Sequence, residues 1–199
     1  MAGGRAIPAI VLVGAMLAVR VSAQDSGFWL MGYPPGGSAS GVRALSQDGL
    51  TAGGGSFIPA TNQSASFRWT AQAGRDDWGL LPGMPKRNSV YASDSSGRIV
   101  AGVMSGTGIP NDRGFRRLGE GPLENLGVLP TRDRSFAWGM SGDGNVVVGH
   151  AQSGPQYGFF GEAFRWTPSG AMQGLGYVEP NHTFSRAYGV SRDGKTIVG

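Results

Sequence analysis

One short pattern recurs four times at a nearly constant interval, and this repetition constrains the fold more than any other feature of the sequence. Each copy joins two apolar segments through a turn that ends in glycine, and a second glycine closes the copy five residues later. The turn glycines are Gly49, Gly97, Gly144 and Gly194, separated by 48, 47 and 50 residues. Self-similarity at such a period is the signature of a repeat architecture.

Two further landmarks share this period. The first is a Phe-Arg segment, and its copies are Phe67–Thr70, Phe115–Leu118 and Phe164–Thr167, at intervals of 48 and 49 residues. The second is a short segment of the type Leu-Gly-x-Leu-Pro, and its copies are Trp78–Pro82, Leu126–Pro130 and Leu175–Val178, again at intervals of 48 and 49 residues. Three linked landmarks with one period define a single repeating unit.

Each landmark predicts a piece of β-structure. Asp-Gly between two apolar segments favours a hairpin with a type I′ turn, and the serine two residues before the aspartate can bond to the turn backbone. The predicted turn residues are Asp48, Gly49, Gly97, Asp143, Gly144, Asp193 and Gly194. Phe-Arg-Trp-Thr alternates apolar and polar residues, as a half-buried strand does. A proline then ends the last strand.

One unit therefore offers about four short strands, which is the size of a propeller blade. The predicted fold is all-β, a repeat of four-stranded antiparallel units that forms a partial or open β-propeller. The units span approximately 38–85, 86–133, 134–183 and an incomplete 184–199. The second unit departs most from the pattern, because Ser96 replaces the turn aspartate and Arg117 replaces the tryptophan.

These residues resemble the HAF family of extracellular repeats of bacterial exported proteins. Gly189–Gly199 is similar to the family's hairpin, and Glu162–Thr167 is similar to its strand. The resemblance covers about residues 38–199 and implies a secreted, propeller-like repeat domain without implying an activity. The hairpin alone also resembles that of TolB-type propeller repeats, whose units are shorter and lack the Phe-Arg-Trp-Thr strand.

The first residues have the pattern of a secretory signal peptide. Arg5 precedes the apolar stretch Ile7–Val19, and Val21–Ala23 places small residues where a signal peptidase reads. We expect residues 1–23 to be cleaved and residues 24–37 to form a linker or first strand. An uncleaved anchor is the alternative, but the apolar stretch is shorter than a spanning helix needs. The expected location is extracellular or periplasmic.

Composition narrows the classes of function. Glycine is abundant, at 36 of 199 residues, yet 40% of the residues are hydrophobic, so many tight turns explain the glycine better than disorder does. Loss of Arg5 and Arg20 with the leader lowers the formal net charge of +4 by two, which does not favour nucleic acid as a partner. The absence of cysteine excludes disulfides and thiolate zinc sites.

The fourth unit stops at Gly199 in mid-pattern, after its second predicted strand. A propeller needs roughly four to eight blades to close. We expect a truncated product; pairing with another chain and an open curved array are the alternatives.

Repeated polar and aromatic residues are the candidate sites, each with a structural alternative. The turn aspartates could bind calcium, but one aspartate per turn favours turn chemistry. The repeated arginines Arg68, Arg116 and Arg165 could line a pocket for acidic ligands, although a residue present in every unit more often joins the units. Trp69 and Trp166, together with Trp78 and Trp138, could stack on sugar rings, although tryptophan at a fixed strand position is usually in the core.

Catalysis has little support in the sequence. The chain has no cysteine and only two histidines, His150 and His182, and no nucleophile motif or metal-spaced histidine pair occurs. Glycoside cleavage would need two facing carboxylates. The candidates for that role are Asp76, Asp77, Glu162 and Glu179. We predict no catalytic residue, no cofactor and no metal.

The favoured function is a secreted, non-catalytic module for binding or scaffolding, with carbohydrate or a cell-envelope protein as possible partners. The alternative is a polysaccharide-active or other hydrolytic enzyme on a propeller scaffold. A surface stalk or autotransporter-like passenger is a third hypothesis, which would need a further segment. Specificity is expected in the segments that vary between units, which are 57–64, 106–113 and 152–162.

Overall fold

The computed structural model describes residues 20–23, 26–70, 72–79, 87–106, 109–153 and 160–199. Strands dominate this part of the chain, which contains no α-helix and a single 3-10 turn, η1 (Pro59–Thr61). No helix long and apolar enough to cross a bilayer occurs in it. Residues 1–19 of the predicted signal peptide lie outside the described residues, and Arg20–Ala23 form strand β1.

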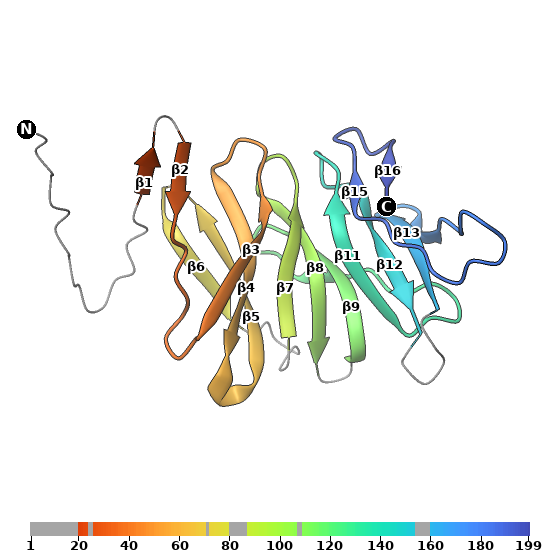
Figure 1. Cartoon of the computed structure of the whole chain (residues 1–199), viewed down its shortest axis with the longest axis horizontal. Helices are drawn as coiled ribbons and strands as arrows, with labels where there is room; N and C mark the ends of the chain where they lie inside the picture. Colours follow the sequence, from red (N-terminus) through yellow and green to blue (C-terminus); the bar gives the residue numbers. More distant parts are fainter. Residues whose placement is uncertain (1–19, 24–25, 71, 80–86, 107–108, 154–159) are drawn as a thin grey trace, which may run out of the picture.

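The strands follow one another in antiparallel runs (Figure 1). The first run is β3 (Ala39–Leu45), β4 (Thr51–Ile58), β5 (Gln63–Thr70) and β6 (Gly74–Gly79). The second is β7 (Arg87–Ser93), β8 (Ile99–Gly106), β9 (Ile109–Leu118) and β10 (Leu123–Asn125). The third is β11 (Arg134–Met140), β12 (Val147–Gln152), β13 (Gly161–Thr167) and β14 (Ala171–Gly174). Within each run, every strand pairs antiparallel with the next.

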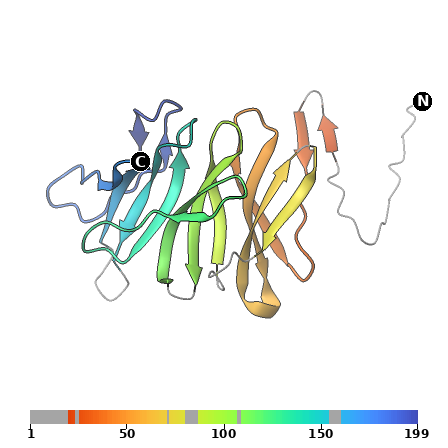
Figure 2. The same cartoon turned by 180° about the vertical axis from the view of Figure 1, so that it is seen from behind.

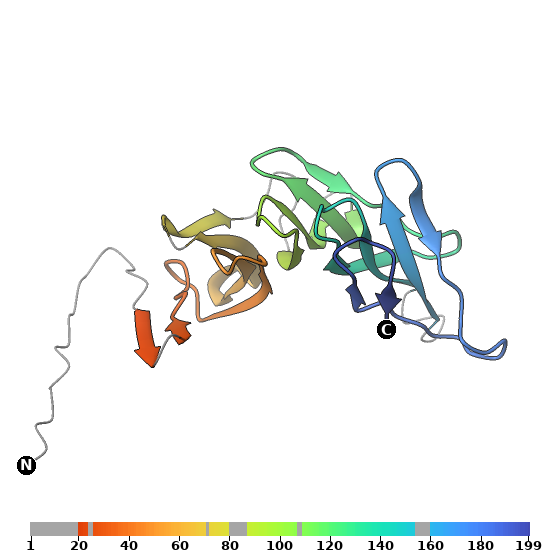
Figure 3. The ribbon, with the colours of Figure 1, turned by 90° about the horizontal axis from the view of Figure 1, so that it is seen from above.

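Two short hairpins flank these runs. The first pairs β1 with β2 (Ser26–Trp29), and the last pairs β15 (Gly189–Val190) with β16 (Ile197–Val198). The first and second runs form one eight-stranded sheet through a single parallel pair, Ser64 with Arg87. An equivalent isolated parallel bridge joins Gly161 to Phe184. The sheets remain open, and from above they spread side by side along the chain (Figure 3).

The first strand of each run carries a bulge at the same place. The register shifts between Val42 and Ala44, between Val90 and Ala92, and between Ala137 and Gly139. The bulged residues are Arg43, Tyr91 and Trp138. A bulge re-aims the extra side chain and increases the local twist.

Glycine is required beside each bulge because the backbone of the neighbouring strand approaches closely. A Cβ at Gly54, Gly102 or Gly149 would overlap a carbonyl group of the bulged strand and also meet a phenylalanine ring. These rings belong to Phe67, Phe115 and Phe164, all fully buried. The recurring glycine and the recurring phenylalanine are therefore one packing unit.

The hairpin turns differ from the predicted type I′ geometry, and that prediction is wrong. Only the glycine of each Asp-Gly pair has a positive φ, about 70° at Gly49, Gly144 and Gly194, and no aspartate is among the described residues with positive φ. The glycine N–H donates to the carbonyl three residues earlier, at 2.9–3.0 Å in these three turns. This is the pattern of a type I turn followed by a left-handed glycine.

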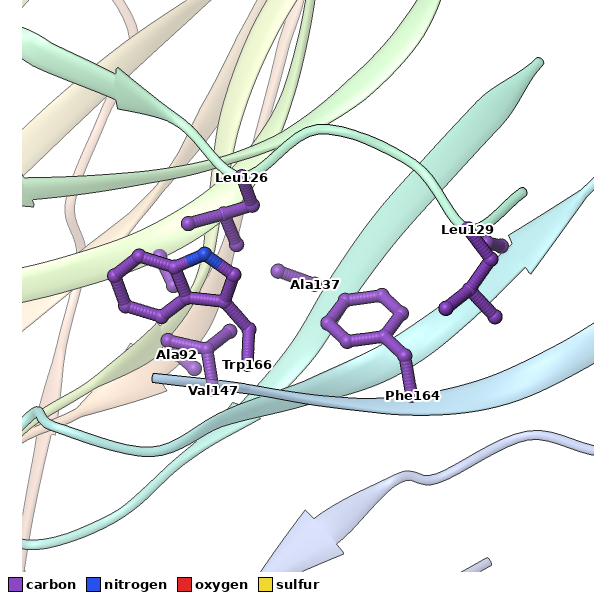
Figure 4. Close-up of a cluster of buried hydrophobic side chains, with 9 residues drawn as sticks. Ala92, Leu126, Leu129, Ala137, Val147, Phe164 and Trp166 are labelled. Carbon is purple, nitrogen blue, oxygen red and sulfur yellow. The ribbon is translucent and has the colours of Figure 1, made fainter. Parts of the chain in front are cut away.

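The hydrophobic core lies between the runs of strands. One cluster joins Ala92 and Leu126 of the second run to Ala137, Phe164 and Trp166 of the third (Figure 4). A second cluster places Ala44 of the first run against Val90, Val100, Met104 and Phe115 of the second. The chain after β10 runs from the second run to the third (Figure 2), with the Leu126 N–H bonded to the Gly114 carbonyl at 3.0 Å. At these two junctions the apolar faces are thus covered by the neighbouring run.

Candidate functional site

A polar concavity opens where the first and second runs meet. It has a volume of about 570 Å³. Its walls come from β3 and β7, the end of β4, the start of β5, the end of β8 and the first half of β9. The lining residues that carry functional side chains are Arg43, Phe57, Asn62, Ser64, Arg87, Tyr91, Ser105 and Asp112.

The varying segments contribute directly to this cavity. Phe57 and Asn62 belong to the first variable segment, and Asp112 belongs to the second. Asn62 has a φ of 52° and ends the turn η1, which brings its amide to the cavity wall. The cavity thus combines a repeated strand framework with residues that differ from unit to unit.

The bulged residues form a row across the first strands of the runs. The Arg43 guanidinium carbon lies 5.0 Å from the centre of the Tyr91 ring. The Tyr91 ring meets the Trp138 ring edge-on, with 4.8 Å between the centroids. Sequence reasoning missed this row. The signal was present, because a large side chain stands five residues before the third turn position in every unit: Arg43, Tyr91, Trp138 and Tyr188.

A second polar group lies at the end of this row. The Trp138 indole N–H donates to His150 Nδ1 at 2.8 Å, and His150 Nε2 lies 3.2 Å from Gln152 Oε1. Because indole can only donate, Nδ1 accepts and the proton sits on Nε2, which donates to Gln152. Burial, and then the positive charge of Arg186, lowers the pKa of His150 to about 4. His150 is thus a neutral, structural group above that pH.

Comparison with solved structures shows a likeness in fold. A putative TolB from Agrobacterium tumefaciens superposes with a TM-score of 0.51 at 13% identity, over 70% of this chain and 50% of the other. The fold is similar to part of a β-propeller. The chain spans about half the length of that protein. No family model matches the sequence, and no curated protein matches it either.

The turn aspartates accept hydrogen bonds from other groups of their own turns. In three turns the serine hydroxyl donates to the aspartate carboxylate at 2.6 Å; the pairs are Ser46–Asp48, Ser141–Asp143 and Ser191–Asp193. Each carboxylate also accepts the N–H two residues later, at 2.9–3.1 Å. These hydrogen bonds lower the pKa of all three aspartates, that of Asp143 to about 2. No group of three potential metal ligands occurs among the described residues.

The second turn keeps the same hydrogen bonds with the residues exchanged. Asp94 stands in the serine position and Ser96 in the aspartate position, and the Ser96 hydroxyl donates to Asp94 at 2.7 Å. The Ile99 N–H donates to Asp94 at 3.0 Å. The departure seen in the sequence at Ser96 is therefore a compensated exchange.

The repeated tryptophans and arginines lie on the third strand of each run. Trp69 and Trp166 are buried in separate apolar clusters and show no ring face to solvent. Arg116 lies over the Trp166 ring at 5.8 Å and donates to the Gly144 carbonyl at 2.9 Å and to Glu124 at 3.0 Å. Arg68 and Arg165 are half-buried in the equivalent strands. None of these five residues lines the polar cavity.

The carboxylates considered for hydrolysis do not converge. Asp76 accepts from the Trp78 indole at 3.1 Å, and Asp77 pairs with Arg75 at 2.6 Å, both in the first run. Glu162 accepts the Gly176 N–H at 3.1 Å in the third run, and Glu179 is exposed in the loop that follows. The described lining of the polar cavity has one carboxylate, Asp112.

Proposed function

We propose that this chain is a secreted, non-catalytic binding module built on a propeller-like array of four-stranded units of the HAF type. The array is supported by contacts that recur at each junction. The Ser66, Gly114 and Ala163 N–H groups donate to side-chain oxygens of the following run, at 2.6–2.9 Å. The acceptors are Asn88, Ser135 and Ser185, which occupy one position of the unit.

A ladder of turn-to-turn hydrogen bonds gives the same support. The backbone N–H of Gln47 donates to the Ser95 carbonyl, that of Ser95 to the Gly142 carbonyl, and that of Gly142 to the Arg192 carbonyl, at 2.9–3.2 Å. All four residues follow the first residue of their turn. The bonds relate the units by one repeated displacement, as in an array where each unit contacts mainly its neighbours.

The observation that carries a binding function is the polar cavity of about 570 Å³ at the variable ends of the first two runs. Repeat proteins hold a constant framework and place specificity in residues that vary between units. Here Phe57, Asn62 and Asp112 vary, while Arg43 and Tyr91 are positioned by the repeated bulge. A single carboxylate among the described lining residues supports binding over glycoside cleavage, which uses two.

The test is binding without turnover. The purified chain is applied to arrays of glycans and of cell-envelope peptides, beside the variants Tyr91→Ala and Arg98→Gln. Arg98 is exposed on the second turn, away from the cavity lining. We expect a ligand that is retained by the wild-type chain and Arg98→Gln, lost by Tyr91→Ala, and unchanged in mass after incubation. Equal retention by all three proteins would refute the cavity, and cleavage of the ligand would favour the hydrolase.

A further inference from the structure

Two guanidinium groups in the polar cavity have hydrogen-bond donors that the fold does not use. Arg43 is exposed and Arg87 is half-buried, and neither makes a hydrogen bond or ion pair through its side chain within the described part of the chain. Other arginines nearby are committed to the fold. Arg75 bonds to Asp77, Ser56 and the Gly32 carbonyl, and Arg117 bonds to Gly121 and Glu120.

The orientation of Arg43 is fixed by two features. The bulge in β3 takes the residue out of regular strand pairing, and its guanidinium lies 5.0 Å from the Tyr91 ring centre. Stacking on an aromatic face leaves the edge of the guanidinium, where its N–H groups are, free for a planar acceptor. A carboxylate is that acceptor, because its two oxygens match the fork of arginine.

The remaining lining groups suit a ligand rich in hydroxyls. Asn62, Ser64 and Ser105 make no side-chain hydrogen bond with the described residues, so their donors and acceptors face the cavity or solvent. Phe57 is 39% exposed and supplies an apolar surface for the C–H face of a sugar ring. Asp112 can accept hydroxyl protons, but it opposes a second negative charge on the ligand.

We propose that this cavity binds an acidic carbohydrate, with a sugar carboxylate paired to Arg43 and the ring hydroxyls held by Asn62, Ser64 and Asp112. The proposal rests on the binding function above and names its ligand class. One carboxylate per sugar matches two arginines opposed by one aspartate, whereas a doubly charged phosphate would meet Asp112 unfavourably. The unpaired hydroxyl and amide side chains of the cavity favour a saccharide, whose hydroxyl groups they can bind. An acidic peptide would instead satisfy its backbone N–H and C=O groups by pairing with a strand edge.

The experiment compares two ligands that differ only in charge. An oligosaccharide of uronic acid and the same oligosaccharide with its carboxyl groups reduced to alcohols are titrated calorimetrically into the full chain. We expect the acidic form to bind at least about tenfold more tightly, since one lost charge-assisted bidentate pair corresponds to that change or more. The preference should weaken as salt is raised, because the cavity is open to solvent.

Variants then assign the preference to Arg43. Arg43→Gln should lower the affinity for the acidic form about tenfold and leave the reduced form unchanged, and Arg43→Lys should restore part of it. Arg98→Gln removes the same charge from an exposed turn and should change neither affinity. Far-ultraviolet circular dichroism confirms that each variant is folded.

Different failures refute different statements. Equal affinity for the two oligosaccharides, reduced by Tyr91→Ala, would overturn the acidic class and keep the binding function. Capture of an acidic peptide through Arg43, with neither sugar bound, would overturn the carbohydrate. No binding of either sugar, together with array ligands that ignore Tyr91→Ala, would overturn both the inference and the proposed cavity.

Discussion

The hairpin turns tolerate an exchange of serine and aspartate between two positions. The turn needs one carboxylate and one hydroxyl two residues apart, because the hydroxyl proton bridges to the carboxylate and both then accept backbone N–H groups. Asp94 and Ser96 supply the same pair in reverse order. The requirement therefore falls on the pair and its hydrogen bonds rather than on either position.

This leads to a prediction for the second turn. Ser96→Asp alone places a second carboxylate against Asp94 without a bridging proton, and should lower the free energy of unfolding by about 1 kcal/mol or more. The double change Asp94→Ser with Ser96→Asp recreates the order of the other turns and should stay within about 0.5 kcal/mol of the wild-type chain. Urea unfolding measures both, and equal losses would contradict the exchange.

His150 makes the stability depend on pH. Its pKa is about 4 in the folded chain and 6.5 when exposed, so the unfolded chain binds the proton more readily. This contribution is fully present above pH 6.5 and declines as the pH falls towards 4. The total loss is up to about 3 kcal/mol, from 1.36 kcal/mol per pKa unit. Asp143, with its pKa lowered to about 2, adds a loss that begins below its ordinary value of 3.8.

Comparing pH series separates the two contributions. His150→Gln keeps an acceptor for the Trp138 indole and should remove the decline between pH 6.5 and 4, while the loss at lower pH remains. The measurement is the denaturation midpoint at each pH for both proteins. Parallel curves across this interval would show that His150 is not the titrating group.

At the scale of the strand, the bulge and the glycine beside it depend on each other, because the bulged backbone lies close to the glycine. Gly102→Ala would drive a Cβ into the Ser89 carbonyl and the Phe115 ring, where no flexible side chain can yield. We expect a loss of more than about 3 kcal/mol. Gly41→Ala is the matched change in β3, since a Cβ there meets nothing within 4 Å, and it should alter stability by less than about 0.5 kcal/mol. Thermal unfolding distinguishes them, and similar midpoints would refute the close approach.

The residues just before β3 occupy the place that the Leu-Gly segments occupy after the second and third runs. The Gly32 carbonyl accepts the Ser40 hydroxyl at 2.5 Å, as Gly127 accepts Ser135 and Gly176 accepts Ser185 at 2.6 Å. All three glycines have a positive φ. Met31 packs against the cluster of Trp69, as Leu126 packs with Trp166. The segment predicted as a linker or first strand is thus anchored to the first run.

At the scale of the whole molecule, the two ends of the series of strand runs differ in how their apolar side chains are covered. Met31 covers the first run, while the chain that follows the last run carries exposed apolar side chains. These are Leu175 (45% exposed), Val178 (88%), Tyr188 (57%) and Val198 (61%). At the junction of the second and third runs the equivalent of Leu175 is Leu126, which is only 4% exposed. An uncovered apolar edge with open strands favours association.

Association through this edge is testable. The 199-residue chain should self-associate at micromolar concentration, and the double variant Leu175→Lys with Val198→Lys should shift it towards monomer. Leu45→Lys is the control, because Leu45 is 63% exposed but lies at the first turn. Sedimentation velocity gives the distributions. A wild-type chain that is monomeric at all concentrations would contradict the prediction.

The sequence predicted the β-class and the strands well, because both rest on local patterns. Phe164–Thr167 alternates in and out of the core as expected, and each Asp-Gly pair does end a hairpin turn. It predicted the turn type wrongly, because Asp-Gly is compatible with two backbone geometries and the serine–aspartate hydrogen bonds select one. The candidate cavity was not predicted from the sequence, because Arg43, Asn62 and Asp112 line one cavity only after the strands from β3 to β9 have assembled into a sheet.

The sequence by itself determined the period, the strand segments and the sites where glycine must stand, since these follow from patterns within one unit. The tertiary structure alone decided which faces are covered, which arginines are committed to the fold and where a cavity opens. The physical reason is that no unit buries its apolar face alone. The neighbour that covers it also accepts a hydrogen bond from Arg116 through the Gly144 carbonyl, whereas the side chain of Arg43 makes no hydrogen bond with the described residues.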